Sequence, residues 1–177
     1  MFRYNIEKSI KTSQRLSLLG VLFAACLFGV SLQAQGWEKD FGGAATDEGT
    51  SVIQTLDHGF LTVGFSESFG EDNDLDVYVV KTDIDGNIVW SKAYDLGYIE
   101  HGYKVLEAAD GGFVIVGDII SRFGDSKDLL LLKISKTGEL LWHRVYEKSG
   151  NQIGWSITKA INGGYIIAGE TSDSLEN

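Results

Sequence analysis

The sequence contains an internal repeat with a period of 52 to 53 residues, which limits the folds that it can form. Trp37, Trp90 and Trp142 lie 53 and 52 residues apart. Other positions align at the same spacing, in sets of aromatic and glycine residues: Phe41, Tyr94 and Tyr146; Gly49, Gly102 and Gly154; Gly64, Gly117 and Gly169. A fixed period of this length indicates a propeller or a solenoid, in which each repeat is one small structural unit.

Each repeat predicts four short strands joined by glycine-containing turns. The first complete unit predicts strands at 51–56, 60–65, 77–83 and 88–94, and 37–41 predicts the last strand of a preceding unit. β-Branched and aromatic residues dominate these segments, and turn signals recur too often to leave room for a three-turn helix. The predicted fold class is therefore all-β. Four antiparallel strands in about 52 residues are typical of a β-propeller blade.

The repeat divides residues 35–177 into units at 37–89, 90–141 and 142–177, of which the last is incomplete. These units make about two and a half blades, whereas a closed ring needs at least about four. We therefore expect a truncated chain, with self-association through open blade edges as the alternative.

The third strand of each complete unit, at 77–81 and 129–133, is apolar on both faces and is expected to be buried on both. Aligned tryptophans are expected to pack the blades, and aligned glycines to form turns that need a positive φ. The expected structural contacts of the blades are Trp37, Trp90, Trp142, Gly59, Gly112 and Gly164.

Residues 1–34 have the pattern of a secretory signal peptide. Four basic residues and one acidic residue precede an apolar run from Leu16 to Leu32, and Ala34 offers a small residue for cleavage. An uncleaved membrane anchor is the second interpretation, because the run is just long enough to span a bilayer. A lipoprotein modified at Cys26 is the third. We expect secretion to the extracellular space or cell surface, or to the periplasm, without stable membrane insertion after cleavage.

The charge balance excludes one class of partner. The chain carries 15 basic and 25 acidic side chains, a net charge of −10, and removing residues 1–34 takes away more basic than acidic groups. A nucleic-acid binder needs the opposite sign, so we expect no nucleic-acid partner. The only cysteine is Cys26, so no disulfide can form within the chain.

Several segments together resemble a known kind of protein. Trp37-Glu-Lys-Asp-Phe-Gly-Gly43, Asp47-Glu-Gly-Thr-Ser-Val-Ile-Gln-Thr55, Asp57-His-Gly-Phe60 and Ser68-Phe-Gly70 resemble the repetitive propeller domains of secreted bacterial proteins, best known from Bacteroidota. The resemblance covers 37–177 and implies a propeller fold and export, without a defined activity. Lys136-Thr-Gly-Glu-Leu-Leu-Trp142 also resembles the tryptophan motif of quinoprotein-type propellers, where the tryptophan docks one blade against the next.

The segment from Glu71 to Asp76 carries the candidate metal ligands Asp72, Asp74 and Asp76. Carboxylates at alternate positions occur in calcium-binding loops, but an EF-hand loop starting at Asp72 would need Gly and Glu where Val77 and Asp83 stand. A solvated loop is the favoured interpretation, so we expect neither a metal nor another cofactor. The Asp83 to Asn87 segment, which also matches part of a mannose-binding motif, is interpreted as a hairpin turn.

The remaining candidates are isolated side chains. His58, His101 and His143 have no metal-ligand spacing, and His58 stands in a turn position that glycine fills in the other units. Trp155 could stack on a sugar, although packing in the core or at a blade edge is commoner for such a residue. No catalytic motif occurs, so we expect no enzyme.

These observations predict an exported repeat protein that acts as an extracellular or cell-surface scaffold, binding an unidentified protein or glycan. The alternative is a polysaccharide-binding module or one associated with a glycoside hydrolase. A glycosidase itself would need two carboxylates about 5–10 Å apart in one pocket.

Overall fold

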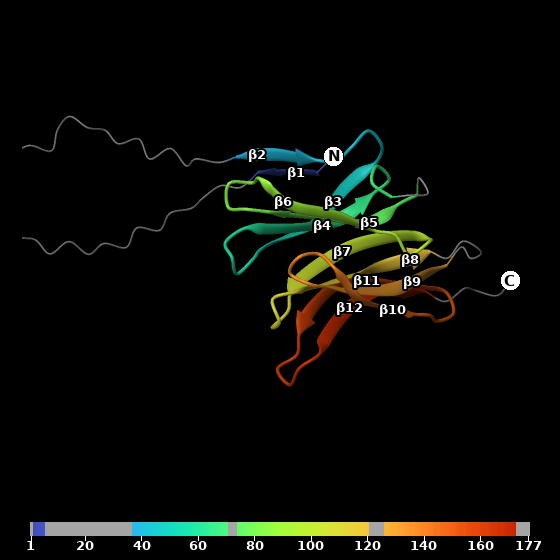
Figure 1. The fold of residues 1–177 in the computed structure, drawn as a ribbon. Coiled ribbons are helices and arrows are strands. Elements are labelled where there is room, and N and C mark those ends of the chain that lie inside the picture. Colours follow the sequence, from blue (N-terminus) through green and yellow to red (C-terminus); the bar gives the residue numbers. More distant parts are fainter. Residues whose placement is uncertain (1, 6–36, 71–73, 121–125, 173–177) are drawn as a thin grey trace, which may run out of the picture.

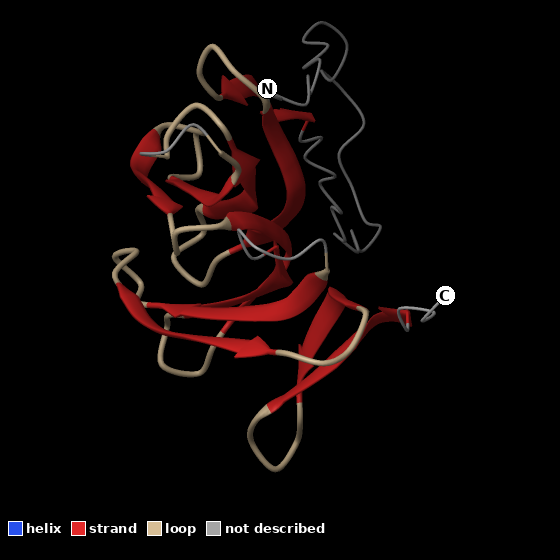
Figure 2. Ribbon diagram, turned by 90° about the vertical axis from the view of Figure 1, so that its right-hand side faces the viewer, coloured by secondary structure: helices blue, strands red, loops and turns tan. Residues whose placement is uncertain are grey.

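The computed structural model describes residues 2–5, 37–70, 74–120 and 126–172 (Figure 1). Within these ranges every regular element is a strand, which confirms the predicted all-β class (Figure 2). In the same ranges, no helix is long and apolar enough to cross a membrane.

Each of the first two repeats forms one four-stranded antiparallel sheet, with the strands in chain order. The first unit contains β3 (Asp47–Gln54), β4 (Phe60–Ser66), β5 (Asp76–Thr82) and β6 (Ile88–Tyr94). The second unit contains β7 (Ile99–Glu107), β8 (Phe113–Ile120), β9 (Lys127–Ile134) and β10 (Leu140–Tyr146). The third unit is the pair β11 (Asn151–Lys159) and β12 (Tyr165–Ser172).

A separate pair of strands precedes the first unit. β1 (Phe2–Asn5) lies antiparallel to β2 (Glu38–Phe41), with Phe2 opposite Phe41. β1 belongs to the expected signal segment, of which 6–34 lies outside the described residues. β2 corresponds to the last strand of a repeat, whose free edge offers backbone groups to any available strand.

The units are stacked face to face (Figure 1). The first strand of each unit lies against the preceding unit: β7 packs on β3, β4 and β5, and β11 packs on β7, β8 and β9. We call the contact between the first and second units the first junction, and the contact between the second and third units the second junction.

The third strands lie inside this stack. Every residue of β5 is buried, which confirms the prediction of a strand covered on both faces. Val77 and Val79 join the core of the first junction, whereas Tyr78 and Val80 pack with Phe41 of β2 on the other face. The alternating side chains of β5 therefore contribute to two separate cores, one on each face of the strand.

Strand boundaries agree with the sequence at β6 and differ most at β3. β3 begins at Asp47, four residues before the expected start, and pairs with β4 up to Ser66. The polar residues at its start gave no strand signal, and the register shifts between Gly49 and Ser51. A β-bulge at Thr50 breaks the alternation from which the strand would have been recognised.

Candidate functional site

The first strand of every unit carries a β-bulge at the same repeat position. The register shifts at Thr50 in β3, Tyr103 in β7 and Trp155 in β11, each directly after a glycine. A bulge leaves one residue outside the regular pairing and turns its side chain. The repeat therefore presents one redirected side chain per unit, with a different residue type each time.

Glycine is needed opposite the bulge because the backbones come too close for a side chain. A Cβ atom on Gly117 would lie 1.7 Å from the His101 carbonyl oxygen, and one on Gly169 would lie 2.0 Å from that of Ile153. The aligned glycines of the sequence are thus part of the device that forms the bulges.

Four rings from three units form a row, which we call the aromatic row: Phe65, His101, Tyr103 and Trp155. The ring centroids of Phe65 and His101 are 4.7 Å apart, and those of Tyr103 and Trp155 are 4.6 Å apart. Between these pairs, the His101 and Tyr103 rings are nearly parallel at 5.9 Å. Trp155 ends the row and is 47% exposed, so the row opens to solvent at this end.

Asp118 holds the middle of the row in place. Its fully buried carboxylate lies 3.0 Å from His101 Nδ1 and 3.4 Å from Lys127 Nζ, and it hydrogen-bonds Tyr103. Burial opposes ionisation of Asp118, but these partners outweigh it, so its pKa is lowered. The pKa of Tyr103 is raised, by burial and by the neighbouring Asp118 carboxylate. Asp118 therefore stays charged and fixes the orientation of two rings.

Sequence reasoning singled out Trp155 but missed its partners. Tyr103 aligns with Trp155 in the repeat, which is the signal that could have linked them. Asp118 has an aromatic counterpart, Phe65, in the first unit, and therefore gave no repeating pattern.

A second group of polar residues lies at the first junction. Asp76 begins β5, Asp95 follows β6, and Glu100 lies in β7 of the next unit. One carboxylate oxygen from each lies within 4.8 Å of the others. Asp76 and Glu100 are fully buried, whereas Asp95 is exposed. We call these three residues the acidic cluster.

The carboxyl of Glu100 is strongly perturbed in this cluster. Burial raises its pKa to about 9, and the charges of Asp76 and Asp95 act in the same direction. The Leu96 N–H donates to Glu100 Oε2 at 3.4 Å, whereas no N–H donor among the described residues reaches Oε1. The Glu100 carboxyl also lies within hydrogen-bonding reach of the Asp76 carboxyl.

Of the three metal candidates named from the sequence, the structure brings only Asp76 into the acidic cluster. Asp74 lies in the loop before β5 with a buried Oδ1 atom, and Asp72 lies outside the described residues. Asp95 and Glu100 were not recognised, because they lie 19 and 24 positions beyond Asp76 and belong to no local motif.

Trp37 and Trp90 each lie over a hairpin turn of the following unit. Trp37 Nε1 donates to the Ile84 carbonyl oxygen at 3.2 Å, and Trp90 Nε1 donates to that of Lys136 at 3.2 Å. Glycine in the turn makes room for the ring: a Cβ atom on Gly138 would lie 3.0 Å from ring atoms of Trp90. Trp142 is 37% exposed and lies under the Arg144 guanidinium.

The turn glycines act within their own units rather than between them. A Cβ atom on Gly59 would lie 2.1 Å from the Thr82 carbonyl oxygen, and one on Gly112 would lie 2.4 Å from that of Ile134. Gly164 has a φ of 80° and open space around it. Gly59 and Gly112 therefore allow the second strand to begin close to the end of the third.

Two ion pairs stabilise the turns of the first and second units. Lys81 Nζ lies 2.9 Å from Asp57 Oδ1, and Lys133 Nζ lies 2.6 Å from Asp110 Oδ1. Both lysines are buried, so the lysine that ends each apolar third strand is used inside the unit. His58 has a φ of 69°, in agreement with its interpretation as a replacement for a turn glycine.

Two other candidates have local roles or none. Asp83 Oδ1 accepts hydrogen bonds from the backbone of Asp85 and Asn87, both at 2.9 Å, as expected for a hairpin turn. His143 lies in β10 with an exposed side chain.

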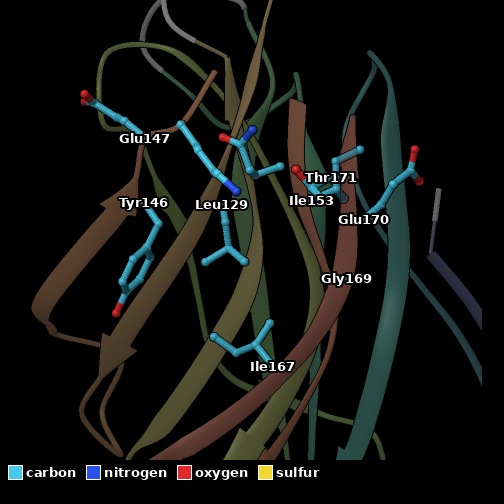
Figure 3. A pocket seen from close by; sticks show the side chains of 10 residues that line it. Leu129, Tyr146, Glu147, Ile153, Ile167, Gly169, Glu170 and Thr171 are labelled. Carbon is cyan, nitrogen blue, oxygen red and sulfur yellow. The ribbon is translucent and has the colours of Figure 1, made fainter. Parts of the chain in front are cut away.

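An apolar groove of about 550 Å³ runs along the second junction (Figure 3). Leu129 of β9, Tyr146 of β10, Ile153 of β11 and Ile167 of β12 line it. At the first junction, the residues equivalent to Leu129, Tyr146 and Ile167 are buried beneath β9. Among the described residues, no strand takes that place at the second junction.

A comparison with protein-family models finds no match, and a comparison with curated proteins finds no significant match.

Proposed function

We propose that this chain is an exported repeat scaffold of the β-propeller type that binds an extracellular glycan. Stacked four-stranded units, and tryptophans lying over the turn of the following unit, support a blade architecture. The basic and apolar start of the sequence supports export.

The contact between Tyr103 and Trp155 is the main support for a glycan as the ligand. These two bulge residues come from adjacent units, and their ring centroids lie 4.6 Å apart. Trp155 is 47% exposed, so its ring is accessible to a ligand. A sugar ring has an apolar C–H face that packs on an aromatic ring, while its hydroxyl groups need polar partners nearby. The bulges build such a platform on regular strands, which hold it more firmly than a loop would.

Polar groups around the row suit hydroxyl recognition. His101 and Lys127 are held by Asp118, so their positions are set before a ligand arrives. The carboxylate of Asp118 is fully buried and engaged by three partners, which suits positioning rather than proton transfer. We therefore propose binding rather than hydrolysis.

A glycan array probed with the full-length protein tests this function. Wild-type protein should retain at least one glycan class, and Trp155→Ala should weaken that binding at least tenfold. Trp142→Ala removes another partly exposed tryptophan and should leave binding unchanged. Equal binding by wild type and Trp155→Ala would contradict the proposal, and release of reducing sugar from the bound glycan would favour a hydrolase instead.

A further inference from the structure

We propose that Asp76, Asp95 and Glu100 bind a calcium ion that joins the first unit to the second. The three carboxylates come from the start of β5, the segment after β6 and the strand β7. A bound ion would therefore link two elements of the first unit to the first strand of the next. This site is separate from the aromatic row and does not depend on the proposed glycan role.

The geometry fits one ion of this size. The three oxygens lie within 4.8 Å of one another. Calcium binds oxygen at about 2.3–2.6 Å, so two oxygens on opposite sides of one ion lie about 5 Å apart. A single calcium ion can therefore contact all three carboxylates with only small side-chain adjustments.

The burial of Glu100 is the independent observation that points to a ligand. Its side chain is fully buried, and no N–H donor in the described part of the chain reaches its Oε1 atom. The group within hydrogen-bonding reach of this carboxyl is a second acid, Asp76, which brings no positive charge. A carboxylate desolvated in this way is costly unless a cation or a proton neutralises it. A bound divalent cation would neutralise this buried carboxylate.

An access route lies beside the cluster. A mainly polar cavity of about 560 Å³ is lined by Gly70, Tyr94 and Asp95, among others. Gly70 is itself pressed against the cluster, since a Cβ atom there would lie 1.7 Å from Asp76 Oδ2. An ion could thus enter past the exposed Asp95 and reach the two buried carboxylates.

The second junction provides a natural comparison. The repeat places Asp128, Glu147 and Gln152 where Asp76, Asp95 and Glu100 stand. Gln152 is a neutral amide whose Nε2 donates to the Ser149 carbonyl oxygen at 3.0 Å. The substitution of Gln for Glu removes a charge at the buried position, so we expect a calcium site only at the first junction.

Calorimetric titration of calcium into EDTA-stripped full-length protein tests this site. We expect one ion per chain and a rise of several degrees in the melting temperature. Glu100→Gln, which copies the residue of the second junction, should weaken binding at least tenfold. Glu147→Gln is the matched control and should bind calcium as the wild type does.

Asp95→Asn provides a second test if Glu100→Gln fails to fold, because Asp95 is exposed and its substitution leaves the core intact. It too should weaken calcium binding at least tenfold. The proposal is overturned if wild type binds no calcium at millimolar concentration, or if Asp95→Asn binds it as wild type does. In the first case, a proton shared between Asp76 and Glu100 would neutralise the cluster.

Discussion

The two junctions are built from the same repeat, yet equivalent side chains lie in different surroundings. Tyr94 at the first junction is 6% exposed, whereas Tyr146 at the second is 48% exposed. Ile115 is buried and the equivalent Ile167 is half-buried. The difference is β9, whose Leu130 and Leu132 complete the first core, while no described strand does so at the second.

The comparison shows that burial is not a property of a repeat alone. Each unit supplies one face of a junction, and the following unit supplies the other face through its first and third strands. A pattern of apolar residues that recurs in each unit therefore predicts which side chains can be buried, and the neighbouring unit decides whether they are.

The largest expected contrast is in the cores of the two junctions. Phe113→Ala should lower the free energy of unfolding by about 3–5 kcal/mol, because Phe113 is almost fully buried in the first core. The equivalent change Tyr165→Ala should cost about 1 kcal/mol, since Tyr165 is only partly buried. Urea unfolding of the full-length protein would measure both. Equal losses would show that the second junction is as tightly packed as the first.

The docked tryptophan should give the next largest contrast. Trp90 is half-buried and hydrogen-bonded to the following unit, so Trp90→Ala should cost about 2–3 kcal/mol. Trp142 has no such turn to pack on among the described residues. Trp142→Ala should therefore lower the free energy of unfolding by less than about 1 kcal/mol. The same urea experiment compares them. A loss below about 1 kcal/mol for Trp90→Ala would mean that this residue does not hold the units together.

Low pH should weaken the ion pair between Asp57 and Lys81 in the turn of the first unit. The Thr55 hydroxyl and Lys81 lower the pKa of Asp57 to about 2, whereas the third unit has Asn162 at this position. A lowered pKa means that the stabilising effect of Asp57 is complete above its ordinary pKa near 4 and is lost as pH falls through 2.

In Asp57→Asn, the free energy of unfolding should therefore decrease less between pH 4 and pH 2 than it does in the wild type. We expect a change of at most about 1 kcal/mol, because the carboxylate is largely exposed. Asn162→Ala removes no carboxyl group and should leave the acid slope unchanged. Melting temperatures measured across this pH range would show the effect. If the melting temperature changes with pH equally in wild type and Asp57→Asn, Asp57 does not contribute to the acid sensitivity.

The smallest expected effect concerns the turn of the first unit. His58 has a positive φ where the second and third units have Gly111 and Gly163. His58→Gly should stabilise the protein by about 0.5 kcal/mol, because relief of backbone strain is partly offset by the greater freedom of glycine in the unfolded chain. Gly111→His should have the opposite sign. Thermal unfolding of the two variants is the test, and destabilisation by His58→Gly would show that its side chain makes a needed contact.

The sequence was sufficient for the repeating elements of this fold. The spacing of Trp37 and Trp90, the apolar run before Lys81 and the glycine turns predicted strands close to β4, β5 and β6. These features are local: alternation, turn geometry and repeat length act within about 50 residues, so they can be recognised in one unit and checked in the next.

The two proposed sites could not be predicted in the same way. The aromatic row depends on bulges at Tyr103 and Trp155, and a bulge leaves only a glycine pair as its trace in the sequence. The acidic cluster joins Asp76 to Glu100, which belong to different units. Their proximity is created when the sheets stack, and so is the desolvation that raises the pKa of Glu100.

The repeat pattern alone thus predicts the type of each unit, a β-sheet with defined turns and two apolar faces. The stacking of the units sets which faces are covered and which polar groups meet. Strand formation follows from neighbours along the chain, whereas burial, charge interactions and ring contacts follow from distances between units that no single repeat encodes.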